Sequence, residues 1–176
     1  MAVDFKKSDH GTAAGPGRAG SGGAGFGDVV ALASDHGGYD MKEALKPVVE
    51  AAGYTVLDLG CNGPESVDYP DFADAMANAI KVGRASRGVL VCGTGIGISI
   101  AANRHGHIRA ALCHNATTAR LARQHNDANV LALGGRVIGI EVAKDCLTTF
   151  LTTAFEGGRH LRRVAKFSTD VETENA

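Results

Sequence analysis

A cysteine followed by alternating glycines stands at residues 92–99, where the sequence reads CGTGIGIS. The glycines have no side chains to cover the backbone N–H groups, so this loop predicts a cradle for an anion or oxyanion. A thiol beside the N-terminus of a helix is favoured as thiolate, because the positive end of the helix dipole attracts negative charge. Cys92 is therefore predicted to be reactive, whereas Cys61, Cys113 and Cys146 are predicted to be inert.

The spacing within this loop excludes several familiar phosphate and nucleotide loops. A P-loop requires a lysine that is absent here. The dinucleotide motif G-x-G-x-x-G requires glycine at the position of Ile98, and a cysteine phosphatase requires arginine there. The glycines are thus predicted to hold something other than a dinucleotide or a phosphoryl group in transfer.

A carboxylate and an imidazole follow the first apolar run of the chain, in the sequence SDHGG at 34–38. The two glycines allow a tight turn and the close approach of a ligand. Asp35 and His36 are therefore candidate site residues. The alternative is that Asp35 only caps the next helix.

Three arginines near the end of the chain could bind a phosphate group. Arg159 and Arg163 are four residues apart and are expected on one helix face, and Arg136 follows two glycines. Each guanidinium group can bind two phosphate oxygens at once, so three arginines match a phosphomonoester. The alternative is a solvated basic face, which is the stronger explanation for Arg162 and Lys166.

Apolar strands alternate with helices from residue 29 onward, which predicts a parallel sheet with helices on both faces. The expected strands are 29–34, 54–60, 88–93, 108–113 and 129–135, and the expected helices are 39–52, 69–83, 98–104, 116–125, 141–155 and a last polar helix after 160. Ligands of such sheets bind beyond the carboxyl ends of the strands. Asp35, Cys92 and Arg136 all fall at that edge.

His125 is expected at the opposite edge, because it lies between a helix and the strand that follows it. It can reach the carboxyl ends of the strands only from a neighbouring subunit or through a reversal of the chain path. A local role at a helix C-terminus is the alternative.

Length and composition limit the function further. The chain has 176 residues and a net charge of −1, which suits one domain and gives no electrostatic reason to expect nucleic acid or membrane partners. Its four cysteines are widely spaced, unlike those of zinc, redox or disulfide frameworks, and are expected as free thiols in the cytoplasm. We expect a disordered Gly/Ala/Ser-rich leader over 1–27, one domain over 28–170 and a short tail over 171–176.

Six segments resemble the type B ribose-5-phosphate isomerases in order: SDHGG, VDYPDFA, CGTGIGISIAAN, IRAALC, RQHNDANVLALGGR and EGGRHLRRV. The resemblance extends from about residue 28 to 164. It implies a Rossmann-like three-layer sandwich with a five-stranded parallel sheet. It also implies a homodimer or tetramer whose active sites are shared between subunits, a phosphorylated sugar as substrate, and no metal or other cofactor.

The resemblance also implies roles for individual residues. Cys92 is similar to the catalytic base of the cysteine branch of the family, since the other branch has glutamate at the position of Ile98. Asp35 and His125 are similar to residues that bind the sugar and open its ring, and Thr94 assists the thiolate or the sugar hydroxyls. The other expected substrate contacts are His36, Tyr69, Gly93, Gly97, Ser99, Asn126, Arg136, Arg159 and Arg163.

These roles predict interconversion of ribose 5-phosphate and ribulose 5-phosphate through a cis-enediolate. Two alternatives stay open at this point. One is an isomerase of a six-carbon sugar phosphate, such as that of galactose or allose, which would use the same chemistry. The other is a phosphosugar-binding module without catalysis, in which Cys92 would be dispensable.

Overall fold

The computed structural model describes residues 29–167; the predicted leader and tail lie outside this range. The strands are β1 (Val29–Ser34), β2 (Thr55–Asp58), β3 (Arg87–Cys92), β4 (Ala110–Leu112) and β5 (Val130–Gly134). The helices are α1 (Tyr39–Ala51), α2 (Tyr69–Lys81), α3 (Ile96–Ala102), α4 (Ala116–Asn126), α5 (Ile140–Thr152), the 3₁₀ turn η2 (Gly158–His160) and α6 (Leu161–Val164).

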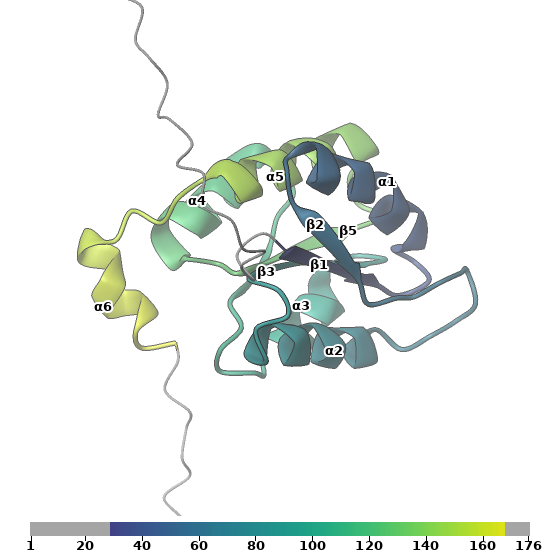
Figure 1. Ribbon diagram of the computed structural model, residues 1–176, viewed down its shortest axis with the longest axis horizontal. Helices are drawn as coiled ribbons and strands as arrows, with labels where there is room; N and C mark the ends of the chain where they lie inside the picture. The colour runs from purple at the N-terminus through teal and green to yellow at the C-terminus, as the bar shows by residue number, and fades with distance from the viewer. Residues whose placement is uncertain (1–28, 168–176) are drawn as a thin grey trace, which may run out of the picture.

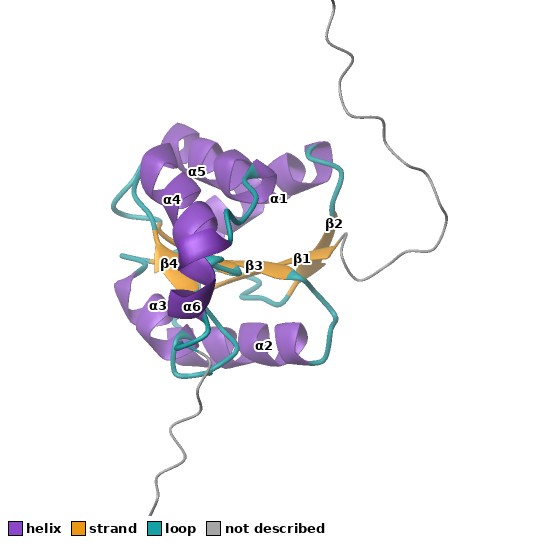
Figure 2. Ribbon diagram, turned by 90° about the vertical axis from the view of Figure 1, so that its left-hand side faces the viewer, coloured by secondary structure: helices purple, strands orange, loops and turns teal. Residues whose placement is uncertain are grey.

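The five strands form one parallel sheet in the order β2-β1-β3-β5-β4. Helices α1, α4 and α5 cover one face of the sheet, and α2 and α3 cover the other (Figures 1 and 2). This arrangement confirms the predicted three-layer α/β sandwich. Because all strands are parallel, their carboxyl ends meet at a single edge.

Burial decreases from the centre of the sheet toward its edges. The three central strands β1, β3 and β5 are almost wholly buried, as expected for apolar runs packed on both faces, whereas β2 and β4 are partly exposed. Each face has its own apolar cluster, one around Phe150 of α5 and the other around Met76 of α2. Within residues 29–167, no helix is long and apolar enough to cross a bilayer.

The helix ends follow local signals in the sequence. Helix α1 stops just before Gly53, which adopts φ +88° and donates its N–H to the carbonyl of Glu50. Helix α2 starts with Pro70 in its first turn, where proline needs no N–H partner. Helix α4 is capped by Asn115, whose side chain accepts the N–H of Thr118 at 2.9 Å.

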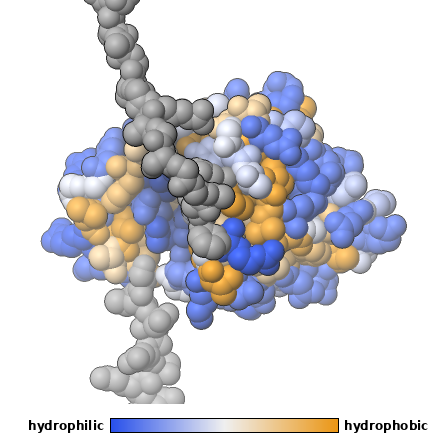
Figure 3. All heavy atoms as spheres, viewed as in Figure 1, coloured by the Kyte–Doolittle hydropathy of each residue, from blue (hydrophilic) through white to orange (hydrophobic). Residues whose placement is uncertain are grey.

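The end of the described chain differs from the single polar helix that was expected. It consists of the 3₁₀ turn η2 and the one-turn helix α6, after Gly157 and Gly158, which both have positive φ. These two glycines let the chain turn from the extended segment after α5 into η2, and α6 then projects from the body (Figure 1). Apolar surface lies on this projection (Figure 3), where Leu161 is 59% exposed and Phe167 is half exposed.

Candidate active site

Three loops meet at the carboxyl edge of the sheet, one from each central strand. The N–H of Asp35 donates to the carbonyl of Val91 at 3.2 Å, and the N–H of Gly135 donates to the carbonyl of Cys92 at 2.8 Å. The N–H of Arg136 donates to the carbonyl of Gly93 at 2.9 Å. Backbone hydrogen bonds thus place Cys92 between the Asp35 loop and the Arg136 loop.

The thiol of Cys92 is held at the bottom of this loop cluster. Cys92 is only 3% exposed, and its Sγ accepts the N–H of Gly95 at 3.0 Å. An N–H donor in this position interacts favourably with negative charge on sulfur. Gly95 can supply it because it adopts φ +78° and packs so closely on Leu133 that a side chain would collide with that residue's backbone.

Two of the other cysteines lie in surroundings that oppose a thiolate. Burial raises the pKa of Cys113, and burial together with Cys113 and Asp145 raises the pKa of Cys146 to about 11. The fourth cysteine, Cys61, directs its thiol to the carbonyl of Gly63 at 3.3 Å. These environments support the prediction that Cys92 is the reactive thiol.

The glycine cradle has fewer open N–H groups than the sequence suggested. Besides the Gly95 N–H on sulfur, the N–H of Ile96 donates to Oγ1 of Thr94 at 3.3 Å. Gly97 has no side chain and so leaves space for the ring of Tyr69, since a Cβ at Gly97 would lie 2.6 Å from Cζ of Tyr69. Ser99 donates its hydroxyl to the carbonyl of Ile96 at 2.8 Å, so this hydroxyl satisfies its own helix.

Asp35 and His36 are both anchored by backbone N–H groups. Asp35 is buried and accepts the N–H of Gly38 at 3.0 Å through Oδ1, within the turn that precedes α1. The N-cap of α1 is Gly38 and no side chain caps it, so Asp35 is not the cap of this helix. His36 accepts the N–H of Val67 at 3.3 Å through Nδ1. The proton of the neutral imidazole is therefore assigned to Nε2, which can donate to a ligand.

A buried ion pair that the sequence analysis missed supports the Asp35 loop. Lys42 is 0% exposed, and its Nζ donates to both carboxylate oxygens of Asp58 at 2.8 and 2.9 Å. Asp58 also accepts the N–H of Gly60, whose carbonyl accepts the N–H of Ser34. The only sequence signal is that Lys42 falls among the buried apolar positions of α1.

This ion pair changes the titration of Asp58. Partial burial by itself raises the pKa of Asp58, but the hydrogen bonds from Lys42 and Lys46 outweigh burial and hold the pKa below its ordinary value. The carboxylate is therefore ionised at neutral pH. It can hold the Gly60 segment in place beside the end of β1.

A second group of polar side chains lies at the amino edge of the sheet, around the last turn of α4. The imidazole of His125 stacks on that of His160, with ring centroids 4.4 Å apart and planes at 7°. One carboxylate oxygen of Glu156 lies 3.9 Å from Nε2 of each ring. Arg159 approaches as well, with its Nε 3.4 Å from Nε2 of His160.

His160 is the functional candidate that the sequence analysis overlooked, although it stands beside Arg159. It is only 5% exposed. Burial lowers the pKa of His160, and the neighbouring His125, Arg159 and Arg163 lower it further. The neutral, buried ring of His160 thus packs against the ring of His125.

The predicted site residues, together with Glu156 and His160, divide between the two edges of the sheet. The carboxyl-end cluster contains Asp35, His36, Tyr69, Cys92, Gly93, Thr94, Gly97, Ser99 and Arg136, and the amino-end cluster contains His125, Asn126, Glu156, Arg159, His160 and Arg163. The five residues of β5 separate them, which is about 16 Å at about 3.3 Å per residue. The expectation that His125 lies at the other end of the strands is confirmed, and one chain does not bring it to Cys92.

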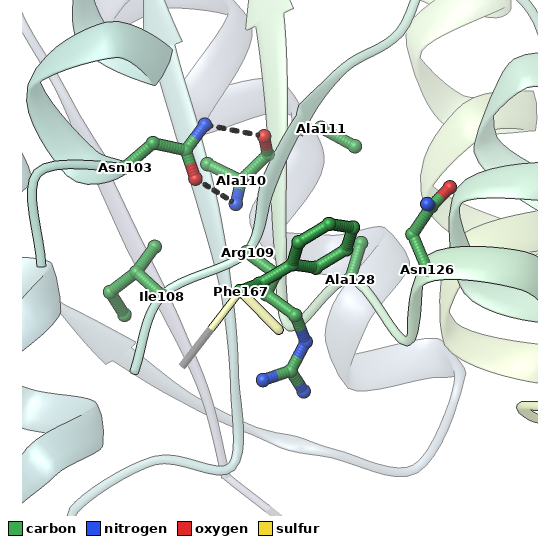
Figure 4. A pocket seen from close by; sticks show the side chains of 8 residues that line it. All are labelled: Asn103, Ile108, Arg109, Ala110, Ala111, Asn126, Ala128 and Phe167. Atoms are coloured by element: carbon green, nitrogen blue, oxygen red, sulfur yellow. Dashed lines mark hydrogen bonds between the residues drawn. The ribbon is translucent and has the colours of Figure 1, made fainter. Parts of the chain in front are cut away.

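A cavity of about 460 Å³ borders the amino-end cluster along the edge strand β4 (Figure 4). Asn126, Arg109 and the ring of Phe167 line it. Ala110 belongs to the same strand, and its backbone exchanges two hydrogen bonds, at 2.7 and 2.9 Å, with the side chain of Asn103 at the end of α3. Asn103 thus satisfies part of the open edge of the sheet.

Comparison with known proteins gives the chain its relatives. The family model described as Ribose/Galactose Isomerase matches residues 30–167. Ribose-5-phosphate isomerase B of Escherichia coli is 44% identical over 135 residues, which is 77% of this chain and 91% of that protein. A D-erythrulose-4-phosphate isomerase of Pectobacterium atrosepticum is 43% identical over 138 residues, 78% of this chain and 91% of its own length.

Solved structures show the same fold. Ribose-5-phosphate isomerase B of Clostridium thermocellum is 51% identical with a TM-score of 0.78, and the match covers 80% of this chain and 95% of that one. The match to the family model includes both clusters, since it extends from β1 to the end of α6. The chain belongs to the Ribose/Galactose Isomerase family.

Proposed function

We propose that the protein interconverts ribose 5-phosphate and ribulose 5-phosphate, with Cys92 as the base. The names of the Escherichia coli and Clostridium thermocellum relatives support this substrate. The observation that carries the proposal is the position of the Cys92 thiol. It lies between the Asp35 and Arg136 loops and accepts the N–H of Gly95.

The active site is proposed to combine the carboxyl-end cluster of one subunit with the amino-end cluster of another. Each cluster alone lacks a part of the chemistry, because the ring-opening imidazole and the thiol lie at opposite ends of β5. Exposed apolar side chains support a subunit contact near both clusters. Ile100 on α3 is 64% exposed, and Leu161 and Phe167 are exposed on the projecting end of the chain.

The first chemical step is the opening of the sugar ring. It requires a proton donor and a proton acceptor near O1 and the ring oxygen. The carboxylate of Asp35 and the imidazole of His125 of the partner subunit fill these roles. The buried ring of the partner's His160 fixes the plane of that imidazole through the observed stack.

The second step is proton transfer between C2 and C1. The Cys92 thiolate removes the proton from C2, which leaves a cis-enediolate with negative charge on oxygen. Backbone N–H groups of the 93–97 loop stabilise that charge; removal of one such donor typically costs about 3–4 kcal/mol. The thiol then returns the proton to C1, while O2 loses a proton and O1 gains one.

The phosphate group is proposed to bind to positive and N–H donors from both subunits. Nε2 of His36 and the guanidinium of Arg136 come from one subunit, and Arg159 and Arg163 of the partner subunit complete the site. Binding energy from this remote group positions C2 against the sulfur. Thr94 and Tyr69 are proposed to contact the sugar hydroxyls.

We also propose that the reaction takes place in the cytoplasm. All four cysteines are unpaired thiols, which is expected in a reducing compartment.

The test is turnover of ribose 5-phosphate in the presence of a metal chelator, for the wild type and Cys92→Ala. We expect chelator-resistant activity that falls by about 10²- to 10⁴-fold in the variant, the usual contribution of a positioned base. Cys146→Ala is the matched control, since it removes a thiol far from the loop and should keep turnover. Full activity in Cys92→Ala would refute the thiol base, and turnover of only a four- or six-carbon sugar phosphate would refute the substrate.

A further inference from the structure

The amino-end cluster contains three side chains that can act as metal ligands. The ligand atoms of His125, Glu156 and His160 all lie within 4.8 Å of one another. The carboxylate oxygen of Glu156 is equidistant from the two imidazoles, at 3.9 Å from each Nε2. Two imidazoles and one carboxylate form a common ligand set for transition metals.

Coordination of an ion requires that the stacked imidazoles of His125 and His160, now 7° from parallel, turn so that both Nε2 atoms face the ion. Ligand atoms around zinc lie about 2.0–2.2 Å from the metal, so they must approach one another to a little over 3 Å. Glu156 and His125 are half exposed and can rotate toward the buried His160. The same exposure leaves open positions for water on the metal.

The charges around the cluster determine which metal fits. Arg159 lies 3.4 Å from His160 Nε2 and must give up that contact, and its charge disfavours any weakly held cation. Imidazole has its highest affinity for zinc, copper and nickel, whereas magnesium and calcium prefer oxygen ligands.

We propose that His125, Glu156 and His160 bind one divalent transition-metal ion of the zinc class per chain, and that this ion inhibits the enzyme. The binding does not depend on the proposed reaction, whereas the inhibition does. A metal on Nε2 of His125 occupies the lone pair that would otherwise serve ring opening. The ion is an inhibitor held beside the site, and the isomerisation itself uses no metal.

The test is zinc binding to the full-length protein, measured by competition with a zinc indicator. We expect one ion per chain and affinity lowered by at least about 10- to 100-fold in Glu156→Gln and His160→Gln, since even indirect supports of zinc ligands have effects of this size. Glu141→Gln is the matched control: this exposed glutamate pairs with Lys144 on α5 and should leave binding unchanged. Thermal unfolding of each variant checks that the fold is kept.

A second variant separates this site from the catalytic thiol, which can itself bind zinc. Cys92→Ser is expected to retain wild-type zinc affinity. Binding that survives in both Glu156→Gln and His160→Gln would overturn the proposal, and so would binding that disappears in Cys92→Ser. A wild-type protein that binds zinc as expected but does not turn over ribose 5-phosphate would contradict only the proposed reaction, so the two failures can be distinguished.

Discussion

The two clusters are built in different ways, although both belong to one proposed active site. The carboxyl-end cluster is fixed by backbone hydrogen bonds between the ends of three central strands, so Asp35, Cys92 and Arg136 have set positions. The amino-end cluster is held by side-chain contacts: the stack of His125 on His160 and the approach of Glu156. Backbone hydrogen bonds therefore hold the proposed base, and side-chain contacts hold the groups proposed to bind the sugar ring and phosphate.

The largest effect is expected when each cluster is inactivated in a different subunit. Cys92→Ala and His125→Ala, each with little activity alone, are expected to recover about a quarter of wild-type turnover when coexpressed. Half of the dimers then carry one intact site, and the lost factor of about 10²–10⁴ is restored at that site. Turnover of the purified mixture is the measurement.

The matched control places both changes in one chain. Coexpression of the wild type with the double variant gives a quarter of wild-type dimers and half of mixed dimers, in which each site lacks either the thiol or the imidazole. Turnover should therefore equal that of the wild-type dimers alone, about a quarter, whereas active mixed dimers would raise it to about half. If these mixed dimers were active, the two clusters would serve one another within a single chain, and the shared site would be wrong.

The ion pair under the carboxyl-end cluster should have the next largest effect. Asp58→Asn leaves the fully buried Lys42 without its main counter-charge and is expected to lower the free energy of unfolding by about 2–3 kcal/mol. The control Asp74→Asn removes an exposed partner of Arg104 and His105 and should cost less than about 1 kcal/mol. Urea unfolding measures both, and equal costs would contradict the role given to burial.

The same pair predicts how stability depends on pH. Because the folded state lowers the pKa of Asp58, its contribution is complete above the unfolded value of about 4 and is lost as pH falls through the lower folded value. Wild-type stability should therefore decline below about pH 4 more steeply than that of Asp58→Asn. Parallel curves would show that this carboxylate does not respond to the ion pair.

The smallest expected effect concerns the contact between Gly97 and Tyr69, a residue proposed to bind the sugar. Gly97→Ala places a Cβ against the ring of Tyr69 and is expected to lower kcat/KM by about tenfold, through misplacement of that ring. Gly139→Ala is the control, since a Cβ there meets nothing within 4 Å.

A double variant sharpens this result. If displacement of Tyr69 is the cause, adding Gly97→Ala to Tyr69→Ala should have no further effect on kcat/KM. An additive loss would place the role of Gly97 in the loop itself.

Most of the fold could be predicted because its signals are local. The central strands are continuous apolar runs, and Gly53 and Pro70 mark helix boundaries at the positions observed. The strand order and the single turn of α6 could not be predicted in this way. They depend on packing between distant segments and on the positive φ of Gly157 and Gly158.

The site shows the same division between local and distant causes. The strand-end rule correctly brought Asp35, Cys92 and Arg136 together, because a parallel sheet leaves little choice at its carboxyl edge. The inward hydroxyl of Ser99 and the stacking of His160 depend on side-chain orientation, which residue spacing does not specify.

The length of β5 has a final consequence for how the protein should behave at low concentration. In the proposed shared site, the two clusters of one chain lie too far apart to hold one sugar phosphate, so the substrate is a ligand of the dimer and has no complete site on a single chain. Mass action then requires that substrate tighten the association of subunits by the same free energy with which association tightens substrate binding. Specific activity should therefore fall on dilution, and added substrate should oppose that fall.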